Sequence, residues 1–298
     1  SNMILNFDEF QKTNQSGSEL NNIRIKNLNI FKEKGFPSKK EENWKYTDLK
    51  TILSSNLSEL EIPDSNEFSE YDKKWLIDDF QHNQIILVNG DFITSNFSFE
   101  NKNKIKIKKL KMVLDDEKDF IKIKSYFDDQ KNSLTSLNHA LVNDGIFLEV
   151  KENYSFRKPL IIYNFFNKSS EKKIINNKNF ISLGNNSKLN LLDYYQAEDG
   201  VKYFNNTISN YSIQKNAVLK KFNIFKNFDN SYNYNLINVK SYANSIFETF
   251  LFSCGSNFVK NEIHCDLLEN FGTCFVNALI FLNNQQHHEL KTNVNHRH

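Results

Sequence analysis

A run of strand-like segments fills residues 179–296 and restricts the possible folds of this chain more than any other feature. Each segment is rich in Ile, Leu, Phe, Tyr, Val and Thr and is bounded by Asn, Ser, Gly or Lys, which is typical of β-strands between turns. No helical pattern interrupts the run. The segments are NFISL (179–183), SKLNLLDYY (187–195), FNNTISNYSIQ (204–214), AVLKKFNIF (217–225), NYNLINV (233–239), SIFETFLF (245–252), FVKNEIHCDLL (258–268) and TCFVNALIFL (273–282).

Several of these segments alternate between two kinds of side chain, as a strand with one buried face requires. Ile263, Cys265 and Leu267 lie on one face of their segment. His264 and Asp266 lie on the other. The alternation predicts that Cys265 is a small buried apolar residue.

Small or Asn-rich turns precede new strands at 184–189, 215–219, 242–247 and 270–275, at intervals of roughly 27 to 30 residues. This spacing is typical of a solenoid, whereas a sandwich of hairpins turns about every 8–12 residues. The chain has only 8 Gly. Asn takes the place of Gly in these turns, since Asn tolerates the left-handed conformation. The pattern therefore favours a mainly β fold, a parallel β-helix with two or three strands per coil, over a sandwich.

Helices are expected mainly before this run. Residues 18–34 have a helical pattern that ends at Gly35, and residues 133–145 predict a short helix capped by Ser133. The stretch 102–114 predicts a half-exposed strand with a lysine face. We therefore divide the chain into an N-terminal helical region, residues 1–80, and a parallel β-helix core, residues 81–298.

Composition and charge argue against several classes of function. A net charge of +2 does not indicate a basic surface for nucleic-acid binding. No apolar run is long enough to span a membrane. The N-terminal residues are polar and lack the basic and apolar regions of a signal peptide. Together with the small number of cysteines, this predicts a reducing, cytoplasmic setting. The motifs of P-loop, dinucleotide-binding and nucleophile-elbow enzymes are missing. Metal-site spacing is also missing from the cysteines, which are Cys254, Cys265 and Cys274.

Four stretches resemble the SufD branch of the SufB/SufD family of iron–sulfur cluster assembly proteins. SKKEENWKYTDL (38–49) resembles its N-terminal motif, and LVNGDF (87–92) is similar to the strand and turn that follow. SLTSLNHALVNDGIFLEV (133–150), together with KPLIIYNF (158–165), resembles the segment that leads into its β-helix, and QHHELKTNVNH (286–296) is similar to its late histidine-containing strand. The residues of these motifs that we single out as structural candidates are Trp44, Tyr46, Asn138, Asp144 and Gly145. Without the resemblance, Trp44 is best explained as a residue that docks a helical arm rather than as a ligand platform.

The resemblance implies a small helical region followed by a right-handed parallel β-helix. It also implies a non-catalytic scaffold subunit that pairs with SufB through end strands of the β-helix, as a heterodimer or a homodimer, within a SufBCD complex that contains the SufC ATPase. No intrinsic cofactor is implied. A transient iron–sulfur cluster belongs to the assembled complex, for which a bound reduced flavin has also been proposed.

The histidines of the last stretch are the candidate functional residues. The resemblance aligns His296 with a family histidine at the SufB–SufD interface near the nascent cluster, where a neutral imidazole acts as a ligand or proton carrier. In a strand, His288 and Thr292 share the face of His296, and His287 faces away. His288 is therefore a weaker candidate, and no metal ligand set can be assigned.

The sequence departs from the family pattern in two places. In the family the β-helix continues past the strand of His296, and a helical C-terminal segment that docks SufC follows. We therefore expect an incomplete solenoid, with SufC binding only in a longer chain. Lys260 also stands where the family has an arginine.

Two alternative functions remain open. One is the sister scaffold of the SufB type, but the strand around His296 has no cysteine to bear a cluster, and the start of the 38–49 motif favours SufD. The other is a β-helix carbohydrate-active enzyme, which would need a groove of acids with Arg or Lys bases and usually a secretion signal.

Overall fold

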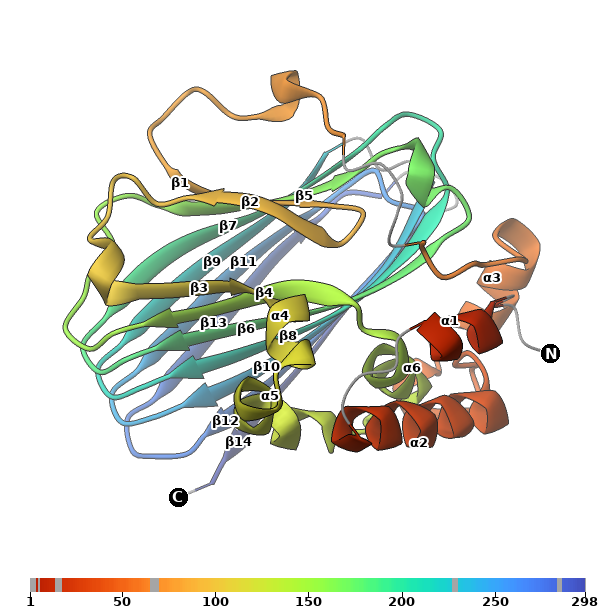
Figure 1. Cartoon of the computed structure of the whole chain (residues 1–298), viewed down its shortest axis with the longest axis horizontal. Coiled ribbons are helices and arrows are strands. Elements are labelled where there is room, and N and C mark those ends of the chain that lie inside the picture. The colour runs from red at the N-terminus through yellow and green to blue at the C-terminus, as the bar shows by residue number, and fades with distance from the viewer. Residues whose placement is uncertain are drawn as a thin grey trace.

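The computed structural model describes residues 4, 6–13, 18–64, 70–226, 230–282 and 286–297. Figure 1 shows two stacks of long strands, with α1, α2, α3 and α6 gathered at one end of the molecule. The strands form two seven-stranded sheets, here called the first sheet, of order β13-β11-β9-β7-β5-β1-β2, and the second sheet, of order β14-β12-β10-β8-β6-β4-β3.

Successive strands along the chain alternate between the two sheets. The first sheet contains β1 (Asn83–Val88), β2 (Asp91–Asn96), β5 (Leu160–Phe166), β7 (Lys188–Ala197), β9 (Val218–Lys226), β11 (Ile246–Ser253) and β13 (Thr273–Ile280). The second sheet contains β3 (Ile105–Lys109), β4 (Asp144–Val150), β6 (Ile174–Leu183), β8 (Tyr203–Ile213), β10 (Ser231–Ser241), β12 (Phe258–Leu267) and β14 (His287–His296).

Pairing within both sheets is parallel from β4 onwards, which identifies a solenoid. Asn177 pairs with Thr207, Thr207 with Asn235, and Asn235 with Asn261, so each coil takes roughly 30 residues. Antiparallel pairing occurs between β1 and β2 and between β3 and β4. The predicted mainly β solenoid is confirmed, with about five turns and two strands per coil, and the alternative of a sandwich is wrong.

Asparagines form the turns that join β6 to β7, β8 to β9 and β10 to β11. Asn186, Asn216 and Asn244 have φ values of 60°, 60° and 56°, in the left-handed region that Asn tolerates better than most residues. The side chain of Asn216 donates to that of Asn186 at 3.1 Å, and Asn186 donates to Asn153 at 3.0 Å. These bonds tie the β8–β9 turn to the β6–β7 turn, and the β6–β7 turn to Asn153.

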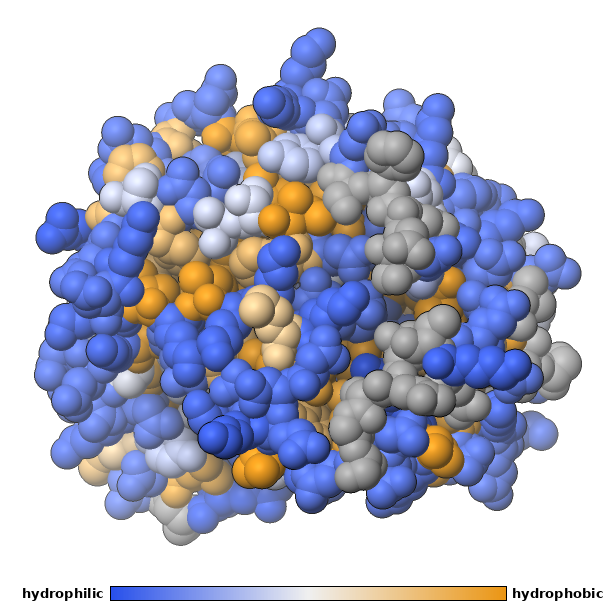
Figure 2. Space-filling view, in the orientation of Figure 1, coloured by the Kyte–Doolittle hydropathy of each residue, from blue (hydrophilic) through white to orange (hydrophobic). Residues whose placement is uncertain are grey.

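The space between the sheets holds an apolar core together with a few buried polar groups. Ile263, Cys265 and Leu267 point into this core, as their alternation predicts. Lys221 and Asp193 form a buried ion pair at 3.6 Å in the same interior. On the face shown in Figure 2, apolar surface is visible between β2 and β3. A pocket of about 400 Å³ opens there beside Phe97 and Ile105.

The helices pack on the outer face of the second sheet. Leu134 and Leu137 of α6 join Phe204 and Tyr234 of the sheet in one apolar cluster, together with residues of α1, α2 and α3. The helices are α1 (Phe7–Thr13), α2 (Ser18–Lys34), α3 (Leu49–Asn56), α4 (Leu110–Asp115), α5 (Glu117–Ile123) and α6 (Ser133–Leu141). The predicted helix over residues 18–34 is confirmed. The boundary at residue 80 stays a prediction.

Three local expectations are wrong. The helix predicted over residues 133–145 ends at Leu141, because Asp144 and Gly145 belong to β4 and pair with β6. The cap of α6 is Asn132 rather than Ser133, because the Asn132 side chain accepts from the N–H of Thr135 at 3.0 Å. The strand predicted over 102–114 ends at Lys109, and α4 follows it directly, burying Leu110. Leu110, Val113 and Leu114 pack into a helical cluster, and this tertiary contact outweighs the period-two pattern of the lysines.

Within the part of the chain that the structure describes, none of the helices combines the length and the apolar character that crossing a bilayer requires.

Three motif residues lie where α6 meets the first coils. The Asn138 side chain donates to the carbonyls of Asn177 and Asn206 at 2.8 and 2.9 Å, which joins α6 to β6 and β8. Asp144 accepts from the N–H groups of Phe92 and Lys111 at 2.8 and 3.0 Å. A Cβ at Gly145, whose φ is +151°, would lie 1.7 Å from the carbonyl oxygen of Lys178.

Gly145→Ala is expected to lower the free energy of unfolding by about 4 kcal/mol or more, because the methyl group meets backbone that cannot move aside. The matched control is Gly200→Ala, where φ is +77° but no atom lies within 4 Å, so a loss of about 1 kcal/mol is expected. Urea unfolding followed by circular dichroism measures both. Equal losses in the two variants would contradict the steric explanation.

Candidate functional site

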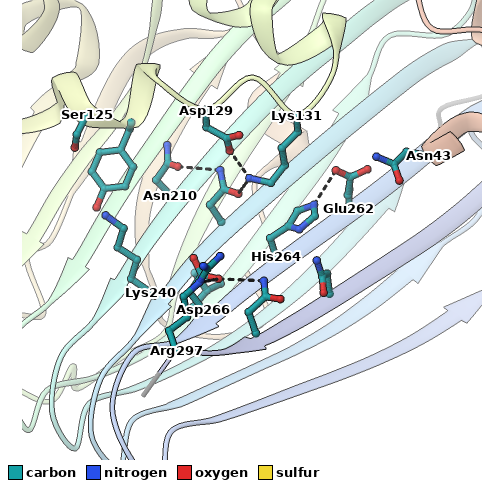
Figure 3. Close-up of a pocket in the computed structure, with 15 residues that line it drawn as sticks. Asn43, Ser125, Asp129, Lys131, Asn210, Lys240, Glu262, His264, Asp266 and Arg297 are labelled. Atoms are coloured by element: carbon teal, nitrogen blue, oxygen red, sulfur yellow. Dashed lines mark hydrogen bonds and ion pairs between the residues drawn. The ribbon is translucent and has the colours of Figure 1, made fainter. Parts of the chain in front are cut away.

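A polar groove lies on the outer face of the second sheet at its last coils (Figure 3). Strands β10, β12 and β14 form its floor, the segment 125–131 forms one wall, and Asn43 lies at one end. Its volume is about 470 Å³. The lining residues are Asn43, Ser125, Tyr126, Asp129, Lys131, Asn210, Asn238, Val239, Lys240, Glu262, His264, Asp266, Asn293, Asn295 and Arg297.

Strand alternation explains the floor. Ile263, Cys265 and Leu267 face the core, so the alternating residues of β12 must face outward. Glu262, His264 and Asp266 therefore follow one another along the groove (Figure 3). The parallel register places Asn293 beside His264 and Asn295 beside Asp266 on β14, which widens this polar row across the coil.

The wall of the groove is held from beneath by α6. Lys178 is fully buried, and its Nζ lies 2.7 Å from Nδ1 of His139, whose Nε2 bonds the carbonyl of Asp129. Burial holds the pKa of both Lys178 and His139 well below its ordinary value. Lys178 donates to Nδ1, and Nε2–H of His139 donates to the carbonyl of Asp129, so this buried chain of hydrogen bonds fixes the position of the wall.

Each of three acidic residues in the groove contacts a basic side chain. Glu262 bonds His264 at 2.8 Å, Asp266 lies 3.3 Å from Arg297, and Asp129 pairs with Lys131. Burial opposes ionisation of Glu262, but the hydrogen bond and charge of His264 outweigh it and lower its pKa. Lys240 lies 4.4 Å above the ring of Tyr126. The groove thus offers hydrogen-bonding groups whose charges compensate one another.

Among the described residues, no three His, Cys, Asp or Glu side chains lie close enough together to share a metal ion.

Trp44 holds the N-terminal arm, the segment that contains Asn43, Trp44 and Thr47, beside this groove. Its ring is fully buried, lies 5.5 Å from that of Tyr234, and has the ammonium of Lys260 at 3.9 Å from its centroid. Lys260 also donates to the carbonyl of Asn43 at 2.5 Å. Tyr46, by contrast, is 72% exposed. Trp44 therefore joins the arm to the last coils.

Thr47, His287 and Glu289 form a second contact between the arm and β14. The Thr47 hydroxyl donates to Oε2 of Glu289 at 2.6 Å, so Nε2–H of His287, also at 2.6 Å, must donate to the hydroxyl oxygen. Burial raises the pKa of Glu289, but the hydrogen bonds of His287 and Thr47 and the charge of Lys260 outweigh burial and hold this pKa at about 2.

The two candidate histidines share one face of β14 but lie in different surroundings. His288 lies at the inner side of the coil, where its Nδ1 is 2.5 Å from Oγ of Ser253 and its Nε2 is 2.7 Å from the carbonyl of Ser256. Burial lowers its pKa. His296 is exposed at the end of the strand beside Leu267. Neither lines the groove.

Sequence reasoning missed the groove itself. The alternation in β12 placed His264 and Asp266 on one face, but nothing local indicates that Lys131 or Arg297 lies opposite them. The five motif residues lie outside the groove lining as well, since Asn138, Asp144 and Gly145 are in the first coils and Trp44 and Tyr46 are in the arm.

Two protein-family models match the chain. One, described as the SufBD protein N-terminal region, matches residues 5–162. The other, described as the SUF system FeS cluster assembly SufBD core domain, matches residues 165–298. A search of curated proteins found no match.

The Glu289 contact predicts a specific acid sensitivity. The folded pKa of about 2 lies below the ordinary 4.5, so the stabilisation is complete above about pH 5 and is lost as pH falls towards 2. We expect Glu289→Gln to lower the free energy of unfolding by about 2 kcal/mol at pH 7, allowing for partial exposure of the carboxylate, with the difference from wild type shrinking in acid. Urea unfolding between pH 7 and pH 3 measures this.

Exposed Glu152 provides the control for this measurement. Glu152→Gln should leave the pH profile of the wild type unchanged. A Glu289→Gln profile parallel to that of the wild type would contradict the assigned contact.

Proposed function

The chain belongs to the SufB/SufD family of the SUF iron–sulfur cluster assembly system, and we propose that it serves there as a non-catalytic, SufD-type scaffold subunit that pairs with SufB. The observation that carries this proposal is the outer edge of β14, which no other described strand occupies. Among the described strands, β14 pairs with β12 alone, and β13 pairs with β11 alone. An open edge is a ready template for a strand from a partner.

Backbone hydrogen bonds identify which groups of β14 face this edge. The N–H of His287 donates to Asn257 and that of Arg297 donates to Leu267, both at 2.9 Å. In a parallel ladder, the backbone groups of alternate residues bond to the strands on opposite sides. The N–H and C=O groups of the odd-numbered residues of β14 therefore point towards β12. The even-numbered residues from His288 to His296 therefore present their N–H and C=O groups to the open edge.

His296 is the proposed functional residue of this edge. Its side chain is exposed at the end of β14, so a partner strand added there would run directly beside it. In this proposal the iron–sulfur cluster is the cargo of the pair, and the neutral imidazole of His296 binds iron or carries a proton during assembly.

The alternatives fit the site less well. A SufB-type scaffold would bear the cluster on a cysteine, and β14 contains histidines but no cysteine. A carbohydrate-active enzyme would need acids poised for proton transfer. In the groove, Glu262, Asp266 and Asp129 each already contact a basic side chain. These contacts favour a binding role.

Thr292→Pro tests the strand edge. The backbone N–H of Thr292 points to the open edge of β14, and the side chain of Thr292 is exposed. Proline at this position therefore removes an outward hydrogen-bond donor without breaking the ladder to β12. We expect the Kd for SufB to rise at least tenfold, measured by calorimetry on the intact chain, with the thermal unfolding midpoint little changed. Thr292→Ala is the matched control and should bind like the wild type. Equal affinity of the Pro and Ala variants would refute pairing at this edge.

His296→Ala separates pairing from cluster chemistry. We expect the complex with SufB to form normally but to hold less than half the iron and acid-labile sulfide of the wild type after anaerobic reconstitution. His82→Ala, which removes an imidazole near the first sheet, is the control and should leave cluster content unchanged. Unchanged cluster content in His296→Ala would remove this residue from the proposal while leaving pairing intact.

A further inference from the structure

The outer face of the first sheet exposes a group of aromatic and aliphatic side chains on β9, β11 and β13. The exposed fractions are 47% for Phe222, 36% for Phe250, 55% for Phe275 and 45% for Leu279. These residues are neighbours, since Phe222 pairs with Phe250 in the ladder and their rings lie 6.2 Å apart. A contiguous apolar patch of this kind marks an interaction surface more often than single exposed residues do.

The residues that flank these rings show that Phe222 and Phe250 belong to the outer face of the sheet and not to the buried core. Lys221 and Asn223 on either side of Phe222 are buried in the interior, as is Thr249 beside Phe250. Strand alternation therefore directs Phe222 and Phe250 outward. The patch is a consequence of the sequence pattern, with aromatic residues at positions where a free sheet face would carry polar ones.

The same face is covered at its other end by the chain itself. Tyr71 stacks on Phe165 of β5 at 5.4 Å, and Trp75 meets the same ring edge-on at 5.2 Å. The N–H of Ile77 donates to the hydroxyl of Tyr163 at 3.0 Å. We call residues 70–79 the covering segment, because Tyr71, Trp75, Leu76 and Ile77 pack on the outer face over β1 and β5.

Register rows run from the covered part of the face to the uncovered part. In one row Ile161 is fully buried, Leu192 is half-buried, and Phe222 and Phe250 are exposed. In the next row, Tyr163 and Tyr194 are buried, followed by half-buried Ile224 and Phe252 and exposed Leu279. The first row therefore stays apolar as far as β11, where Asn277 of β13 follows Phe250, and the second row stays apolar as far as β13.

Charge indicates what covers the remaining strands. The outward-facing ionisable residues of β7, β9 and β11 are Lys188, Lys220, Lys226 and Glu248, so the patch is bordered mainly by positive charge. The covering segment has the complementary character. It places its apolar side chains on the sheet and exposes four carboxylates, those of Glu70, Asp72, Asp78 and Asp79, against two lysines, Lys73 and Lys74, so it is acidic overall.

We propose that the outer face of β9, β11 and β13 is the docking site for an extended, acidic, aromatic-bearing segment of a partner protein. This segment continues the cover that residues 70–79 place over β1 and β5. Its rings pack on Phe222, Phe250 and Leu279, and its carboxylates lie near Lys220 and Lys226. The site is independent of the β14 edge, because it lies on the face of the other sheet.

A peptide with the sequence of the covering segment, EYDKKWLIDD, is the probe. Labelled with a fluorophore and titrated with the intact chain, it is expected to bind with a micromolar Kd, measured by fluorescence polarisation. The double variant Phe222→Ser/Phe250→Ser should weaken binding at least tenfold. These two residues lie outside the cluster that the chain's own segment covers, so displacement of that segment by the peptide would not depend on them.

Matched controls separate this site from general stickiness. Met112→Ser/Ile121→Ser removes two exposed apolar side chains, 62% and 64% exposed, from the helices α4 and α5 and should leave the affinity unchanged. A peptide with its four acids replaced by Lys should bind at least tenfold more weakly. Circular dichroism checks that both double variants stay folded.

Four results would overturn the proposal. Three concern the peptide: absence of binding at millimolar concentration, equal weakening of its binding by both double variants, and equal affinity of the chain for the charge-reversed peptide. The fourth is a dimer in sedimentation equilibrium that dissociates in Phe222→Ser/Phe250→Ser, since it would assign the face to a second copy of the chain. Loss of SufB pairing in Thr292→Pro would leave all four measurements unaffected.

Discussion

In-register stacking of parallel strands is the constraint on which the rest of this structure depends. A single coil cannot bury its own apolar side chains, so each coil needs the next one to complete the core. The register keeps inward residues above inward residues, as with Ile237 and Ile263, and aligns the turns through Asn186 and Asn216. The same stacking leaves the last strand of each sheet, β13 or β14, paired on one side among the described strands. The proposed SufB edge is thus a direct product of what holds the fold together.

The buried lysines show how this core tolerates charge. Burial opposes the charge of Lys221, but Tyr211 and Asp193 outweigh it and raise its pKa, so the ammonium and carboxylate remain an ion pair. Lys178 contacts His139 rather than a carboxylate, and burial lowers its pKa well below the ordinary value. Desolvation costs several kcal/mol per ion, so a buried charge needs a partner that compensates for the lost water. Lys178 has the imidazole of His139 as its hydrogen-bond partner, and this contact supports the groove wall.

Much of the fold could be predicted from the sequence because its determinants are local. Period-two alternation at Ile263 and Leu267 and the recurrent Asn turns are features of short segments, and they indicate strands and solenoid spacing directly. The groove could not be predicted in the same way. Asp129 and Lys131 come to lie opposite His264 and Arg297 only after three coils have stacked and α6 has packed on the second sheet. Likewise, the hydrogen bond from Thr47 to Glu289 joins residues 242 positions apart.

The two outer faces of the solenoid differ in what covers them, and this difference bears on how many partners the chain can hold at once. The second sheet is covered by its own helices and by the arm, through clusters that include Phe204, Tyr234 and Trp44. The first sheet has its own cover over β1 and β5, while Phe222 and Phe250 stay exposed. A strand added to β14 would extend the second sheet within its own plane, whereas a segment on Phe222 would pack against the plane of the first. The two directions are perpendicular, so occupation of one surface leaves the other accessible, as the proposed scaffold role requires.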